Sequence, residues 1–162
     1  MVKRRVFYSF HYDNDVMRVQ LVRNIGAIEE GNAPVSPSEW ETVKKKGDAA
    51  VRSWIDDAMQ SCSCVVVLVG SDTADRKWVK YEIEKAWNSG KGLLGIYVHN
   101  LKDPQTGTCK QGKNPFDSFT VGEKKVKLSD LVKCYNPKTA DAYNDIRDNI
   151  ADWIEAAIKD RK

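Results

Sequence analysis

Residues 64–87 read CVVVLVGSDTADRKWVKYEIEKAW, and they carry the clearest signal of fold class in the sequence. Its first six residues are all apolar, which is typical of a strand buried on both faces of a parallel sheet. A helix is predicted from about Arg76 to Ser89, where a glycine ends it. The next apolar run, LLGIYV at 93–98, predicts another buried strand. These three segments form a βαβ unit, which requires parallel pairing of the two strands.

The segments before this unit continue the same alternation. RVFYSF at 5–10 is rich in aromatic and β-branched residues and predicts the first strand, with the polar HYDND at 11–15 as a loop. Apolar residues from Asp15 to Ile25 recur near helical spacing and predict a helix. Only AIEEGNAPV at 27–35 remains for a second strand, and its pattern is weak.

Two helices are predicted between this weak strand and the central unit. Ser36, Pro37 and Glu39 form a capping box with proline at the first helical position. The second helix is capped by Asp48 and presents an apolar face through Met59.

The C-terminal third holds a long irregular segment and a closing helix. Residues 100–130 contain glycines, prolines and lysines with little periodicity, and so long a loop often covers a site or binds a partner. A weak last strand is predicted at 131–135, and an amphipathic helix follows from Thr139. The whole pattern predicts a doubly wound α/β domain over residues 1–162, with a mainly parallel sheet of about five strands.

Composition limits the classes of partner. Lys and Arg total 26 against 23 acidic residues, and this formal charge of +3 is too small and too dispersed to indicate nucleic acid. No apolar run approaches the roughly 18 residues of a membrane span, and no signal peptide is evident, so a cytoplasmic protein is expected. The four cysteines, Cys62, Cys64, Cys109 and Cys134, lack a zinc-binding pattern and are expected to be reduced.

Ligands of parallel α/β sheets bind at the carboxyl ends of the strands. This rule selects residues 9–13, residues 70–75 and the segment from His99 onward. None contains the glycine-rich turn of dinucleotide-binding folds, a triphosphate-binding loop or a nucleophile elbow.

Glu82 is the most informative polar residue. In steps of about 100° it lies about 60° from Val79, on the buried side of its helix and one turn after Trp78. A carboxylate there needs hydrogen bonds or a shifted pKa, since an unpaired buried charge is costly. It could be paired with a lysine or arginine for structural reasons. Alternatively, one carboxylate beside an indole suits cleavage of an N-glycosidic bond, because it can hold ribose hydroxyls and stabilise positive charge at the anomeric carbon.

Several segments in order resemble a known family. The run WVKYEI at 78–83 is similar to the W-x-x-x-E pattern of catalytically active TIR (Toll/interleukin-1 receptor) domains, and VFYSFHY is similar to their first strand and active-site loop. Together with SPSEWE, GIYVHNLKD and NPFD, these segments most resemble the TIR-like subunits of bacterial Thoeris antiphage systems. The resemblance covers nearly the whole chain and implies a flavodoxin-like, TIR-like fold.

The resemblance also implies an activity. Such an enzyme consumes NAD⁺ as substrate without a further cofactor or metal, releases nicotinamide and makes a cyclic ADP-ribose isomer that activates a separate effector protein. Members of the family can require an infection trigger or self-association for activity. By motif position Glu82 is implied as the catalytic residue, and Trp40 and Glu41 are implied in a mobile loop beside the site. The implied substrate-binding residues are Phe7, Ser9, Phe10, His11 and Trp78.

Other interpretations remain open from the residues alone. Phe7 and Phe10 could be core residues, Ser9 could bond backbone groups at the strand end, and His11 could be exposed. A further interpretation is a receiver domain, in which a phosphorylated aspartate binds Mg²⁺ and for which Asp13, Asp15 and Asp72 are the candidate carboxylates. Against it, no aspartate directly ends the central strand at 64–69. There are two alternative functions. One is a non-catalytic interaction module that binds a partner through the basic loop around Lys110 to Lys127. The other is a nucleoside N-glycosidase or deoxyribosyltransferase.

Overall fold

The computed structural model describes residues 4–30 and 37–161, and its centre is one parallel sheet. The strands are β1 (Arg5–Ser9), β2 (Glu29–Glu30), β3 (Cys64–Val69), β4 (Gly92–Tyr97) and β7 (Cys134–Tyr135). They are ordered β2-β1-β3-β4-β7, and every pair is parallel. This is a flavodoxin-like strand order, so the predicted fold class and five-stranded sheet are confirmed.

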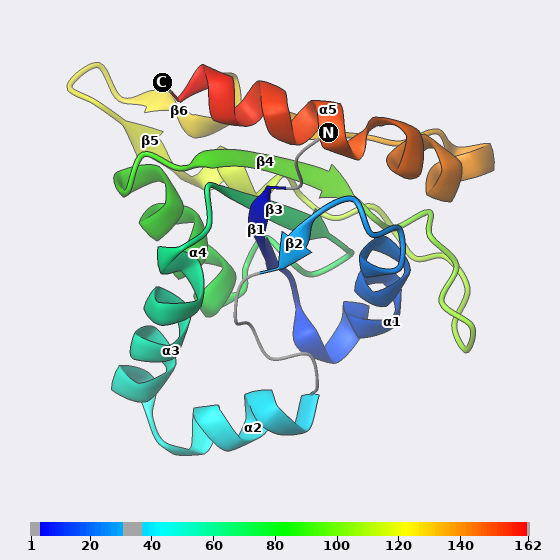
Figure 1. The fold of residues 1–162 in the computed structure, drawn as a ribbon, viewed down its shortest axis with the longest axis horizontal. Helices are drawn as coiled ribbons and strands as arrows, with labels where there is room; N and C mark the ends of the chain where they lie inside the picture. Colours follow the sequence, from blue (N-terminus) through cyan, green and yellow to red (C-terminus); the bar gives the residue numbers. More distant parts are fainter. Residues whose placement is uncertain (1–3, 31–36, 162) are drawn as a thin grey trace.

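Helices cover both faces of the sheet (Figure 1). One face carries α1 (Tyr12–Arg23) and α5 (Ala142–Asp160), which pack on each other. The other carries α3 (Asp48–Gln60) and α4 (Lys77–Asn88), where α4 packs on β3 and β4. The short helix α2 (Pro37–Lys45) packs against α1 and α3. It therefore stands beside the carboxyl end of β1 without belonging to either main layer.

The core lies between these layers and the central strands. All six residues of β3 and all six of β4 are buried, as their apolar sequences predict. On α4 the buried apolar residues are Val79, Ile83 and Ala86, which confirms the predicted core side of that helix.

Two helix beginnings differ from the predictions. The pattern at 11–15 predicts a loop, yet α1 begins at Tyr12 with His11 as its N-cap. Acidic residues near a helix N-terminus are favoured by the helix dipole, so a polar stretch there does not exclude helix. The N-cap of α3 is Gly47 rather than Asp48, and its φ of 99° requires glycine. Asp48 is the first helical residue, and its carboxylate pairs with Lys77 of α4.

Other predicted boundaries fall close to the observed ones. The capping-box serine, Ser36, lies outside the described residues, but the predicted helix after it is α2. The last strand is shorter than expected, and a 3₁₀ turn at Thr139–Asp141 precedes α5. All four cysteines are free, as expected. None of the helices at 4–30 and 37–161 has both the length and the apolarity needed to cross a membrane.

The long segment after β4 is irregular but anchored. It contains 3₁₀ turns at Pro115–Ser118 and Leu128–Asp130 and a small hairpin of β5 (Thr120–Val121) and β6 (Val126–Lys127). Phe116 and Leu128 are fully buried and fix the segment to the core. The extent of the domain over 1–162 stays a prediction.

Candidate active site

The buried polar residues of the structure gather at one edge of the sheet. Ser9 ends β1, Thr73 follows β3 and His99 follows β4, while Asp15 and Arg18 lie early in α1 and Glu82 lies in α4. The carboxyl ends of parallel strands meet at this edge, which is where ligands of doubly wound sheets bind. Buried polar groups are costly unless they are bonded, so their concentration here marks the edge as the candidate site.

Glu82 is bonded to Ser9 across 73 positions of sequence. The Ser9 hydroxyl donates to Glu82 Oε1 at 2.7 Å, and both residues are buried, with 4% of Glu82 exposed. Within the part of the chain that the structure describes, the ion pairs include no lysine or arginine partner for this carboxylate, and the Ser9 hydroxyl is the group that bonds it. A structural ion pair is therefore not what holds Glu82.

Burial sets the charge state of Glu82. Loss of hydration raises the pKa of its carboxyl from 4.5 to about 8, while the Ser9 hydrogen bond acts in the opposite direction. A carboxyl with a pKa near 8 is mostly protonated at neutral pH in the empty site. A cation placed against it would favour the ionised form.

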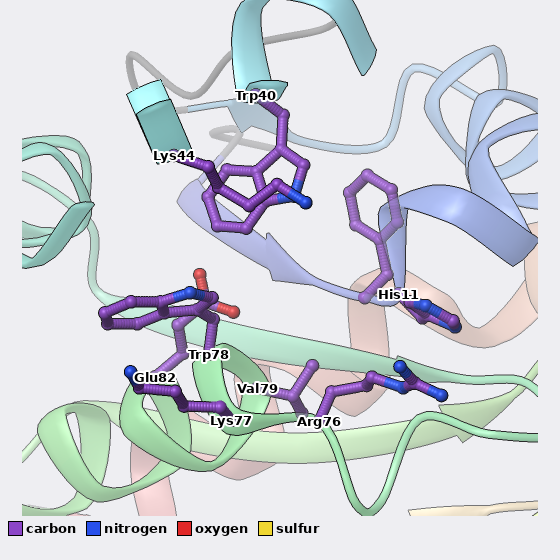
Figure 2. Close-up of a pocket in the computed structure, with 9 residues that line it drawn as sticks. His11, Trp40, Lys44, Arg76, Lys77, Trp78, Val79 and Glu82 are labelled. Carbon is purple, nitrogen blue, oxygen red and sulfur yellow. The ribbon is translucent and has the colours of Figure 1, made fainter. Parts of the chain in front are cut away.

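The Glu82 side chain faces a pocket of about 260 Å³. Figure 2 shows side chains entering this pocket from the end of β1, from α2 and from the first turns of α4. Its lining residues are Phe10, His11, Trp40, Lys44, Arg76, Lys77, Trp78, Val79 and Glu82. None of the lining residues belongs to the segment 100–130, so that loop does not cover this pocket.

The Trp78 side chain is held by contacts with its neighbours. Its ring makes an edge contact with Tyr81 at 5.8 Å between centroids, and Lys77 Nζ lies 4.8 Å from its ring centroid. The Tyr81 hydroxyl donates to Asp56 Oδ1 of α3 at 2.7 Å. The half-buried Tyr81 thus links Trp78 to the neighbouring helix, whereas helical spacing places Tyr81 toward solvent.

Each basic residue at the pocket is paired with an acid. Lys44 Nζ lies 2.9 Å from Glu41 Oε1, and Arg76 Nη2 lies 3.9 Å from Asp72 Oδ2. Lys77 pairs with Asp48. These exposed pairs contribute little stability, but they leave the pocket rim close to electrically neutral.

The predicted site residues separate into those that line the pocket and those that do not. Phe10, His11 and Trp78 line the pocket together with Glu82. Ser9 is fully buried and is not among the lining residues, but it bonds the Glu82 carboxylate. Phe7 is packed in the core and is not among the lining residues.

Two lining residues come from α2. Trp40 and Lys44 are one helical turn apart, so both reach the pocket from one face of α2. The resemblance places Trp40 and Glu41 in a mobile loop, whereas both lie in this helix. Nothing in the sequence singles out Lys44 except its spacing from Trp40, which is consistent with a shared face.

A second buried polar cluster lies beside the pocket. Arg18 Nη1 is 3.1 Å from Asp15 Oδ1, and the same guanidinium donates to the carbonyls of Leu101 and Gly107 at 3.1 and 2.8 Å. The pair therefore ties α1 to the loop after β4. A receiver domain needs free acidic ligands for Mg²⁺, but Asp15 is paired here and the exposed Asp72 pairs with Arg76. No cluster of three His, Cys, Asp or Glu side chains suited to a metal occurs in the described ranges.

Comparison with known proteins agrees with this geometry. Residues 7–103, more than half of the chain, match the family described as "Thoeris protein ThsB, TIR-like domain". The chain is also 38% identical over 118 residues to a Bacillus cereus (strain MSX-D12) protein named "Putative cyclic ADP-D-ribose synthase ThsB1". That alignment covers 70% of this chain and 62% of the relative, so less than two thirds of the relative's length is matched. The family match and this identity together show that the chain belongs to the ThsB family of TIR-like domains.

Proposed function

We propose that this protein cleaves NAD⁺, releases nicotinamide and joins the remaining nucleotide into a cyclic ADP-ribose isomer. The observation that carries the proposal is the buried Glu82 carboxyl, bonded by Ser9 and facing an aromatic-walled pocket at the carboxyl edge of the sheet. The name of the Bacillus cereus relative supports the same reaction class.

Glu82 has the properties that cleavage of this bond requires. Nicotinamide in NAD⁺ is a ring cation, and its approach to the buried carboxyl favours the ionised form. As the bond from the anomeric carbon breaks, the ring leaves with the electron pair and becomes neutral, so no general acid has to protonate it. Positive charge then grows on the sugar, where the Glu82 carboxylate stabilises it in a site of low dielectric.

Ser9 positions the Glu82 carboxylate, and Trp78 contacts the leaving nicotinamide ring. Ser9 holds Oε1 of Glu82, and Oε2, which Ser9 does not hold, is the oxygen that can accept from ribose hydroxyls. Trp78 offers an indole face to the flat, charged ring, a contact that is favourable for cations.

The size of the pocket limits what it encloses. Its volume of about 260 Å³ lies just below the roughly 300–1,000 Å³ of pockets that hold whole drug-sized ligands. We therefore assign the pocket to the nicotinamide and its ribose, while the rest of the dinucleotide lies over the rim.

The test is product analysis with a matched pair of variants. Purified protein and extracts of phage-infected cells expressing it are incubated with NAD⁺, and nicotinamide and nucleotide products are separated by chromatography. Glu82→Gln should reduce nicotinamide release to background. Glu84→Gln changes an exposed carboxylate on the same helix and should leave release unchanged. Undiminished release in Glu82→Gln would contradict the assignment.

The same assay separates the competing functions. Cleavage of nucleosides but not of NAD⁺ would indicate a nucleoside N-glycosidase or deoxyribosyltransferase. A non-catalytic interaction module would release nicotinamide under no condition.

The biological setting is part of the proposal. We propose that the cyclic product activates a separate effector protein during antiphage defence in the cytoplasm, without nucleic acid or membrane as a partner. Expression with the effector should protect cells from phage, and Glu82→Gln should abolish that protection.

A further inference from the structure

Helix α2 places an indole in the pocket from outside the two main helical layers. Trp40 is only 6% exposed and lines the same pocket as Trp78 and Glu82. In the view of Figure 2, the Glu82 carboxylate lies between the indoles of Trp40 and Trp78. The two rings are thus walls of one space, and they belong to different helices.

The position of Trp40 is fixed by its neighbours. Its ring centroid lies 5.7 Å from that of Trp54 on α3, with the planes tilted by 47°. On the pocket rim, Lys44 Nζ lies 5.7 Å from the Trp40 ring centroid and is itself paired with Glu41. Trp40 therefore has an aromatic support behind it, and Trp54 acts as its positioning residue.

The product formed from the sugar cation depends on which nucleophile attacks its anomeric carbon. Once nicotinamide has left with its electron pair, water can attack the anomeric carbon, which gives linear ADP-ribose and one proton. Alternatively, a nucleophilic atom elsewhere in the same nucleotide attacks, loses its proton and closes the ring. The ratio of cyclic to linear product therefore measures how well the pocket excludes water around Glu82.

We propose that Trp40 determines this ratio by closing the pocket wall opposite Trp78 to water. The inference rests on the proposed function and adds a specificity-determining residue to it. Removal of the indole opens a path for water to the anomeric carbon, while the bond-breaking group, Glu82, keeps its bond to Ser9. The rate of nicotinamide release should consequently change less than the product ratio.

The experiment compares Trp40→Ala and Trp40→Phe with a control at another indole. Trp153 stacks on Tyr135 at 4.4 Å, and neither residue lines this pocket, so Trp153→Ala removes a packed indole without opening the site. NAD⁺ turnover is followed by nicotinamide release, by the ratio of cyclic to linear ADP-ribose, and by O-methyl-ADP-ribose formed when methanol is added as a competing nucleophile.

Trp40→Ala should lower the cyclic-to-linear ratio by roughly tenfold, equivalent to about 1.4 kcal/mol between the two product-forming barriers. It should also raise methanol trapping, and Trp40→Phe should stay within about twofold of the wild type. Trp54→Leu keeps Trp40 but removes its support, so it should shift the ratio in the same direction by less. The inference can therefore be tested even where Trp40→Ala does not fold.

Three results would overturn the inference. The first is an unchanged ratio in the Trp40 and Trp54 variants while nicotinamide is still released, which leaves the proposed function standing. The second is an equal shift in Trp153→Ala, which would indicate a general loss of stability. The third is absence of nicotinamide release from the wild-type protein in purified and infected samples, which would overturn the proposed function as well.

Discussion

Replacement of Glu82 by glutamine should stabilise the folded protein at neutral pH. The Glu82 carboxyl has a pKa of about 8 when folded, against 4.5 when exposed. Below pH 4.5 both the folded and the unfolded chain hold this proton. Between pH 4.5 and 8 only the folded chain holds it, so the free energy of unfolding falls as pH rises. Above pH 8 the carboxyl is ionised in both states, so the free energy of unfolding no longer falls with pH through this group.

The size of this effect follows from the pKa difference. One pH unit corresponds to about 1.36 kcal/mol, so Glu82 costs about 3 kcal/mol at pH 7 and about 5 kcal/mol above pH 8. Glutamine has nearly the shape of the protonated carboxyl, and its oxygen can still accept from Ser9. Because it has no proton to lose, the variant should be free of this cost.

The assay is denaturant and thermal unfolding of the wild type, Glu82→Gln and Glu84→Gln between pH 4.5 and 8.5. At pH 4.5 the difference between wild type and Glu82→Gln reports only the change of side chain. At pH 7 the variant should gain about 3 kcal/mol over that baseline, or roughly 6–12 °C in Tm for a chain of this size. Glu84→Gln should show no such trend.

A Glu82→Gln variant that is less stable than the wild type by the same amount at every pH would contradict the raised pKa of Glu82. That result would mean that Glu82 is ionised and paired in the folded protein. It is also the behaviour expected of a Glu82 that holds the fold through an ion pair.

Three further substitutions test the surroundings of the site. Ser9→Ala removes the hydrogen bond that lowers the pKa of Glu82, so the pH profile of nicotinamide release should move upward and stability should fall by about 1 kcal/mol; an unmoved profile would contradict the pairing. Gly70→Ala places a Cβ against the Asp15 carboxylate, so the free energy of unfolding should fall by about 1–3 kcal/mol, and a Tm equal to that of the wild type would count against this packing. Arg18→Ala leaves the Asp15 carboxylate buried without its cation, and denaturant unfolding should register a loss of about 3–5 kcal/mol. A loss below about 1 kcal/mol would show that the pair is not buried in solution.

The central part of the fold could be predicted because its signals are local. The apolar run at 64–69 fixes a strand buried on both faces, and the helical spacing of 79–86 fixes the buried side of α4. The edge strands could not be located well. β2 and β7 have two residues each, and their pairing is imposed by the neighbouring strands rather than by a pattern of their own.

Sequence spacing alone could predict the candidate site only at Glu82, where a charged residue type lies on the buried face of its helix. Glu82 stands out because a carboxylate on a buried helical face is costly, and that conflict is visible in sequence spacing. Its hydrogen-bond partner Ser9 is 73 residues away, and only the resemblance joins the two. The roles of Trp40 and Lys44 depend on how α2 packs against α1 and α3, which periodicity does not report.

The two short edges of the sheet bear on how copies of this chain could assemble. An edge strand recruits another chain through its row of unpaired backbone groups, and a longer row offers a stronger template. Within the ranges that the structure describes, that row is two residues long at β2 and at β7. Assembly by strand addition, the route to fibrils and swapped sheets, is thus disfavoured. A complex formed by this chain would be held by side chains on helices and loops, so single surface substitutions should be able to dissolve it.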